Sequence, residues 1–265
     1  MSHDVNLLLY NVTFHNVKKL QVTLRRNDLS NILRVCPNVQ HLVVSVVGNT
    51  THIDDGLMLA SVNKLQLDFD KCGDTSNKDI SNMLRACPNL LHLVVTGGNI
   101  VIEDGLMMAS IKKLKLDLNI KFGDFSIKDI SNILRACPNL LYLVVDGDGG
   151  NIVIEDGLMM ASVKWMGLKW IGQSGGILLR TAPNLEQLTI IGGFDCPDQE
   201  FSLSKLTKLS LKNVIMTPRA KNILKTKLPE ALKWNDCKHE HFSVKVINLM
   251  VFSLCKLCCF AVTMD

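Results

Sequence analysis

The stretch ISNMLRACPNLLHLVV (residues 80–95) returns as ISNILRACPNLLYLVV (130–145) with two changes, and as LSNILRVCPNVQHLVV at 29–44. A phrase repeated at this length predicts a repeated unit of structure. In its first half, apolar residues recur three and four positions apart, which is typical of one face of a short helix. The proline near the middle of the phrase then ends that helix.

A second phrase alternates with the first. It reads EDGLMMAS at 103–110 and 155–162, and DDGLMLAS at 54–61. Each copy is followed directly by a strand-like stretch, such as IKKLKL at 111–116. The long period of about 50 residues therefore divides into two short repeats. We expect the return segments that contain Gly-Leu-Met to be shorter and tighter than the helical ones.

Both phrases fit one template, apolar-x-x-apolar-x-apolar, which occurs nine times along the chain. The central apolar residues of the nine copies are Leu20, Leu42, Leu65, Leu93, Leu114, Leu143, Met166, Leu188 and Leu209. Neighbouring centres lie 21 to 29 residues apart. This is the spacing at which one short strand and one return segment make one turn of a leucine-rich-repeat solenoid.

The alternation of strand and helix at this period predicts an α/β solenoid of about nine repeats. Parallel strands would form a curved sheet on the concave face, and short helices would lie on the convex face. The template's apolar residues point inward, because alternate residues of a strand face the same way and neighbouring turns cover them. We expect Asp28, Asp79 and Asp129 to cap the helices, and Pro37 and its equivalents to end them.

The units resemble the ribonuclease-inhibitor-like class of leucine-rich repeats, and LRACPNLLHL (84–93) is most similar to the repeats of F-box/LRR proteins. The resemblance extends from Val17 to Lys212. In that family the repeats recognise a substrate, and a preceding F-box recruits a cullin-type ubiquitin ligase. Only 16 residues precede the first template here, too few for an F-box. The resemblance therefore implies a protein-binding module that recognises a ubiquitination substrate without recruiting the ligase.

The register of the template also predicts which side chains a partner would meet, because residues between the inward positions point to the concave face. We define three rows across the strands. The first row precedes each central residue: Lys19, His41, Lys64, His92, Lys113, Tyr142, Trp165, Gln187 and Lys208. The second row follows each central residue and includes Lys115. The third row lies two residues further on and includes Asp68, Asp117 and Asp146.

Tyr142 and Trp165 stand on neighbouring predicted strands, and exposed aromatic residues on a concave sheet are typical anchors of protein interfaces. We predict that this pair forms the centre of the partner-binding site. The other predicted binding residues are His41, Lys64, His92, Lys113 and Lys115. Two alternatives stay open: the aromatic pair only covers an irregular part of the solenoid, and the lysines are ordinary solvated side chains whose field the third-row aspartates dilute.

Composition excludes several classes of function. The chain has 265 residues, 47% of them hydrophobic, so it can bury a sizeable core. Its formal net charge of +4 is too small to indicate a nucleic-acid or membrane partner. No phosphate-binding glycine motif, His-Glu-x-x-His or Gly-x-Ser-x-Gly occurs, so we predict neither catalysis nor a cofactor. The acid pairs of the second phrase recur with it, which favours turn or helix-start residues over acid/base catalysts.

The end of the chain holds the one pattern that suggests a metal. Cys237, His239, Cys255 and Cys258 would supply the ligand types of a zinc site, but the last two lie in the apolar run 244–262, so we expect buried cysteines and no metal. That run nears the length of a membrane span, yet its internal lysine would be costly in a bilayer. A capping helix or an independent tail is favoured. The alternative function is a stand-alone scaffold with a membrane-associating or metal-binding tail.

We divide the chain into an N-terminal cap (1–16), the solenoid (17–212), a C-terminal cap (213–236) and an apolar, cysteine-containing tail (237–265). Cysteines 36, 87 and 137 all stand directly before Pro-Asn, so each is expected to be a small buried residue of its own repeat, not half of a disulfide. The first residues lack the basic and apolar segments of a signal peptide. We expect reduced thiols and a cytoplasmic or nuclear location.

Overall fold

A computed structural model describes residues 13–24, 29–46, 54, 56–69, 77–97, 102–118, 128–147, 152–196, 201–230, 232 and 238–240. Its main feature is a ten-stranded sheet in which neighbouring strands run parallel. The strands, in spatial order, are β1 (Lys19–Leu24), β2 (His41–Val46), β3 (Lys64–Phe69), β4 (His92–Thr96), β5 (Lys113–Asp117), β7 (Tyr142–Asp146), β9 (Trp165–Lys169), β10 (Gln187–Phe194), β11 (Lys208–Met216) and β12 (Lys238–Glu240). Two further short strands, β6 (Lys128–Asp129) and β8 (Ile152–Val153), pair with each other.

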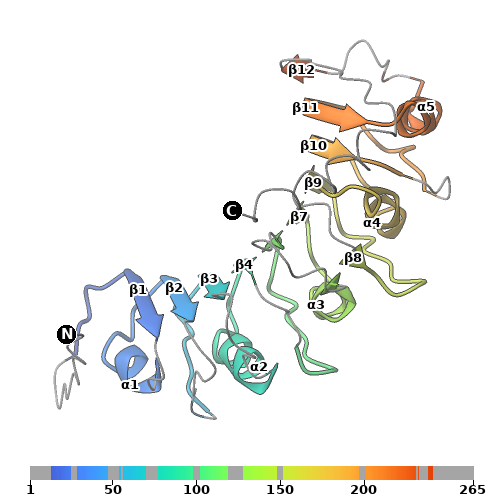
Figure 1. The fold of residues 1–265 in the computed structure, drawn as a ribbon. Helices are drawn as coiled ribbons and strands as arrows, with labels where there is room; N and C mark the ends of the chain where they lie inside the picture. The colour runs from blue at the N-terminus through green and yellow to red at the C-terminus, as the bar shows by residue number, and fades with distance from the viewer. Residues whose placement is uncertain are drawn as a thin grey trace, which may run out of the picture.

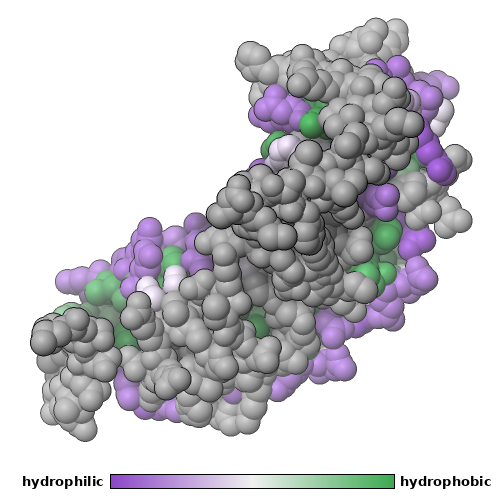
Figure 2. Space-filling view, in the orientation of Figure 1, coloured by the Kyte–Doolittle hydropathy of each residue, from purple (hydrophilic) through white to green (hydrophobic). Residues whose placement is uncertain are grey.

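The strands follow the inner side of an arc, and the helices lie on its outer side (Figure 1). The helices are α1 (Leu29–Arg34), α2 (Asn77–Ala86), α3 (Ser131–Ala136), α4 (Gly175–Thr181) and α5 (Pro218–Lys227). Because the strand order of the main sheet follows the sequence, each return segment brings the chain back beside the strand before it. The α/β architecture is thus consistent with the expected solenoid. The outer, helix-bearing side is mainly hydrophilic where the structure describes it (Figure 2).

The core runs along the stack between the sheet and the return segments. All nine predicted central residues occupy the second position of a strand, and eight of them are at most 2% exposed. The remaining one, Leu20 in the edge strand β1, is half-buried. The next inward position of each strand is buried in the same way from Val44 to Leu211. The apolar template therefore identified both the strands and the core, because each turn covers the inward side chains of its neighbours.

The buried cysteines behave as the sequence predicted. Cys36, Cys87 and Cys137 are at most 5% exposed, and all are free thiols. Burial raises the pKa of Cys87 and of Cys137 to about 12, because the apolar surroundings disfavour a thiolate. These thiols therefore stay protonated and serve as small apolar packing groups.

The two kinds of return segment differ as expected. The first phrase forms α1, α2 and α3, which end before the prolines of residues 37, 88 and 138. In the second phrase, the described residues form turns without a helix. These turns place Gly56, Gly105 and Gly157 at φ values of 89°, 79° and 83°, a left-handed conformation that glycine adopts without strain.

The caps expected at Asp79 and Asp129 are wrong. Helix α2 begins at Asn77, so Asp79 lies inside it, and Asp129 lies in β6. The residue that precedes α3 is Ile130, and no side chain caps that helix end. Asp28 lies outside the described residues. A true cap occurs at α5, where the Thr217 hydroxyl accepts a hydrogen bond from the Ala220 N–H at 3.1 Å.

Two ladders of hydrogen bonds join successive turns. The first uses the buried serine of each copy of the first phrase, which lies in the helix. Its Oγ accepts a hydrogen bond from the N–H of the residue at the start of the next return segment. The pairs are Ser30 with Asp54, Ser81 with Glu103 and Ser131 with Glu155, at 2.8, 2.9 and 2.8 Å. The second ladder uses the asparagine of Pro-Asn, whose Nδ2 donates to a carbonyl one turn back. Its donors are Asn38, Asn89, Asn139 and Asn184, at 2.8 to 3.0 Å.

We predict that Ser131→Ala destabilises the protein by about 1–2 kcal/mol, because it removes the buried acceptor of the Glu155 N–H. Urea denaturation measures this loss of unfolding free energy. Ser162→Ala is a matched control: its hydroxyl donates to the exposed Pro138 carbonyl, which water can satisfy after the substitution. Equal losses in the two variants would contradict the role of the serine ladder.

The sequence suggested turn or helix-start residues for the acid pairs of the second phrase, and the described members lie in turns and do not begin helices. Their first members, Asp54, Glu103 and Glu155, form ion pairs with the arginine of the preceding helix. In the third pair the second acid, Asp156, also binds an arginine, Arg180 of α4, at 2.8 Å. These pairs are exposed, so each contributes little to stability. Their regular spacing explains why the acids recur with the repeat.

Candidate functional site

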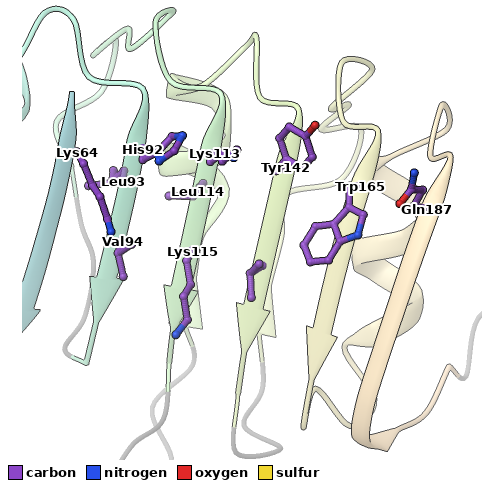
Figure 3. Close-up of a pocket in the computed structure, with 11 residues that line it drawn as sticks. Lys64, His92, Leu93, Val94, Lys113, Leu114, Lys115, Tyr142, Trp165 and Gln187 are labelled. Carbon is purple, nitrogen blue, oxygen red and sulfur yellow. The ribbon is translucent and has the colours of Figure 1, made fainter. Parts of the chain in front are cut away.

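The strand register places the predicted first row on one continuous line across the sheet. Each member lies opposite the next in the neighbouring strand, from Lys19 opposite His41 to Gln187 opposite Lys208. Figure 3 shows the central members projecting from the same face of adjacent strands. The template thus predicted the alignment of side chains from separate repeats.

A hollow of about 440 Å³ lies on this face, over β3 to β10. Its lining residues are Lys64, His92, Leu93, Val94, Lys113, Leu114, Lys115, Tyr142, Val144, Trp165 and Gln187. Six of the seven predicted binding residues line it. The seventh, His41, lies beside Lys64 on the neighbouring strand and does not line the hollow. Its buried Nε2 has no hydrogen-bond partner among the residues that the structure describes.

An aromatic pair forms one end of the hollow. The ring centroids of Tyr142 and Trp165 are 6.4 Å apart, and the ring planes are tilted by 43°. Tyr142 is 42% exposed although its strand is otherwise largely buried, and Trp165 is half-buried. Rings at this distance and tilt attract each other and hold a defined apolar surface open to the outside. Such a surface can receive an apolar side chain of a partner.

The position of the Trp165 ring depends on a glycine that sequence reasoning missed. The indole lies over Gly167, two residues along β9: a Cβ built there would come within 2.7 Å of Trp165 Cη2. The same row position holds Lys115 in β5 and Val144 in β7. A glycine inside a strand often marks the close approach of another group. Gly167 is the single glycine of the described second row, and this was the signal by which the sequence could have shown the close approach.

Cations lie at the other end of the hollow. Lys113 Nζ lies 5.0 Å from the centroid of the Tyr142 ring, within the range of a cation–π contact. Lys115 pairs with Asp117 at 3.7 Å. Among the described residues, no carboxylate lies within 4.0 Å of the ammonium groups of Lys64 or Lys113. Their charges are therefore available to a ligand.

His92 lies between these two lysines in the register of the sheet. Burial, Lys113 and Lys64 lower the pKa of His92, because all three disfavour the imidazolium. Burial, Lys64 and Lys19 lower the pKa of His41 in the same way. In both histidines burial is the largest cause of the lowered pKa, and the neighbouring lysines add to it.

The lowered pKa of His92 predicts a pH effect on stability. The folded protein prefers neutral His92, so the unfolded chain binds the proton more tightly; the stability is complete above the ordinary pKa of about 6.5 and is lost as pH falls through the lower, folded-state pKa. Urea denaturation at pH 7.5 and 5.5 should show a larger acid loss for the natural protein than for His92→Gln. A variant with the same or a steeper loss would contradict the assignment.

The third row is acidic in its middle part. Asp68 accepts hydrogen bonds from Gln66 and Ser45. Asp146 is 4% exposed and receives the Lys169 ammonium at 2.6 Å, while its buried Oδ1 has no hydrogen-bond partner in the described part of the chain. The hydrogen bond with Asp146 raises the pKa of Lys169. The third-row aspartates therefore weaken the positive field only along that edge of the concave face. The first row itself contains no acidic residue.

A more exposed indole lies just outside this set. Trp170 follows β9, is 45% exposed and has a φ of 53°. Its ring lies over Gly192, where a Cβ would come within 2.5 Å of the indole. The template did not place this residue, because Trp170 lies after the strand and outside the three rows.

The metal and membrane expectations fall mostly outside the described residues. Cys237, Cys255 and Cys258 are not described, and His239 lies in β12, where only the backbone is described. Within the described ranges, no three His, Cys, Asp or Glu residues are grouped so as to hold a metal ion. No helix in the described part of the chain is long and apolar enough to cross a membrane.

Comparison of the sequence with models of known protein families gives no match. The curated protein sequences give none either.

Proposed function

We propose that this chain is a leucine-rich-repeat solenoid of the ribonuclease-inhibitor-like class and that it binds another protein on the concave face of its sheet. Repeat spacing, parallel strands in sequence order and the asparagine and serine ladders support the class. The proposed role is binding without catalysis. Stacked repeats suit this role, because their extended concave surface presents side chains from many turns to one partner.

The aromatic pair in the hollow is the observation that carries this proposal. Tyr142 is 42% exposed beside Trp165, although folding normally buries such large rings. Aromatic side chains dominate the energetics of protein interfaces when a partner covers them. Neighbouring lysines add polar contacts at the rim of the same hollow. Protein interfaces combine buried apolar contacts with polar contacts in this way.

Site-specific photo-crosslinking tests the proposal. A benzoylphenylalanine placed at Gln187, an exposed position lining the hollow, should crosslink a partner in cells. The same group at Met107, which is 62% exposed on a return segment, is the matched control. The Gln187 crosslink should disappear when Tyr142→Ala and Trp165→Ala are introduced together. A crosslink that forms only at Met107, or one that survives both substitutions, would place the interface elsewhere.

The similarity of residues 84–93 to F-box/LRR repeats supports ubiquitin-dependent turnover as the context of this binding. In that case the crosslinked partner should be ubiquitinated, and its level should rise when the chain is removed from cells. A partner whose level and ubiquitination are unchanged would leave a scaffold role for the same concave face.

A further inference from the structure

The charges of the concave face are sorted by row. Among the nine first-row positions, four are lysine, two are histidine and none is acidic. The described acids of this face lie in the third row, four residues along each strand, or about 13 Å away. A ligand lying along the first row from β1 to β5 therefore meets only basic side chains.

The hollow divides this row into two chemically different halves. Toward β3 lie Lys64, His92 and Lys113, which stand on the three successive strands β3, β4 and β5. Toward β10 lie the rings of Tyr142 and Trp165. Lys113 joins the halves, because its ammonium lies 5.0 Å from the Tyr142 ring centroid. Figure 3 shows this order from Lys64 to Gln187.

We propose that the partner presents an extended acidic peptide to the first row, with its carboxylates against Lys64 and Lys113 and an adjacent apolar side chain on Tyr142 and Trp165. This inference rests on the proposed binding function and names the chemistry of the ligand. Charge complementarity supports it: a carboxylate would supply the counter-charge that Lys64 and Lys113 lack among the described residues. It would also relieve the repulsion that disfavours protonation of His92.

The dimensions fit a short peptide. Five strand spacings of about 4.8 Å separate β3 from β10, which gives a row of about 24 Å. An extended chain advances about 3.4 Å per residue, so about seven residues span the row. A nucleic acid fits less well, because its phosphates would also approach the third-row carboxylates of Asp68 and Asp117.

A phage-displayed library of random octapeptides, selected on the full chain, tests the inference. We expect enrichment of Asp and Glu next to a Leu, Phe or Trp. The best peptide, synthesised with a fluorescent label, should lose at least about tenfold in affinity toward Lys113→Glu. Lys208→Glu is the matched control, because Lys208 is an exposed lysine of the same row in β11, outside the hollow. Circular dichroism checks that both variants are folded.

The outcomes separate the two proposals. Neutral or basic peptides that depend on Trp165 would refute the acidic ligand and leave the concave binding site in place. Peptides that bind equally well to the Tyr142→Ala/Trp165→Ala protein would contradict both proposals. Failure to select any peptide, equal losses in the Lys113 and Lys208 variants, or displacement of the peptide by a 20-nucleotide oligo(U) RNA that binds more tightly would each overturn the acidic-peptide inference.

Discussion

Replacing Gly97 by alanine is expected to destabilise the protein by about 3 kcal/mol. Gly97 directly follows β4 and has a φ of 73°, a conformation that is costly for any residue with a Cβ. An alanine Cβ would also come within 2.5 Å of the Phe69 carbonyl oxygen at the end of β3. Because that oxygen belongs to the backbone, a simple side-chain rotation cannot relieve the clash. Urea denaturation measures the loss of unfolding free energy.

Gly105→Ala provides the control for this prediction. Gly105 has a similar φ of 79°, but a Cβ there would meet no atom within 4 Å. We expect Gly105→Ala to lower the unfolding free energy by only the cost of the left-handed backbone conformation, about 1 kcal/mol. The difference between the two variants therefore isolates the contact between β3 and the end of β4. Equal losses in Gly97→Ala and Gly105→Ala would contradict the close packing of β4 against β3 at Gly97.

The strands of this protein are predictable because their signal is apolar and regular. Leu114 and Leu143 lie 29 residues apart in the sequence, yet the template alone placed them opposite each other in adjacent strands. Strand β12 escaped prediction because its sequence, Lys-His-Glu, has no apolar residue to match. It lies within the segment that the sequence assigned to the tail.

The helix caps were harder to predict because one residue type serves several purposes. Aspartate before an apolar run is a common cap, yet Asp129 belongs to a short strand. The serine two residues further on, Ser131, bonds to the following turn instead of its own helix end. Contacts between turns depend on how the turns stack, and the local sequence does not contain that information.

The candidate site, too, could be predicted only in part. Strand alternation predicted that Tyr142, Trp165 and the lysines share one face, because a period of two decides which face a side chain occupies. Strand alternation does not predict side-chain conformation. The approach of Lys113 to the Tyr142 ring and the pairing of Lys115 with Asp117 depend on rotamers that the sequence does not fix.

Gly167→Val is expected to weaken partner binding about as much as Trp165→Ala, by roughly 30-fold, with little change in the unfolding free energy. The new side chain would occupy the space of the indole, whose Cη2 lies 2.7 Å from the position of a Cβ at residue 167. Because the indole is the far end of a movable side chain, it can rotate away at small cost to folding. The rotation removes the apolar surface beside Tyr142.

Gly193→Ala is the matched control, because a Cβ there would contact a different indole, that of Trp170, at an ordinary 3.5 Å. Binding of the crosslinked partner or of a selected peptide should be unchanged in this variant. Tryptophan fluorescence should shift in Gly167→Val, because the Trp165 indole becomes more exposed to water. It should stay nearly constant in Gly193→Ala. If Gly167→Val shifts the fluorescence but leaves the affinity intact, Trp165 is moved without consequence. In that event the Trp165 ring would cover the sheet surface and make no contact with the partner.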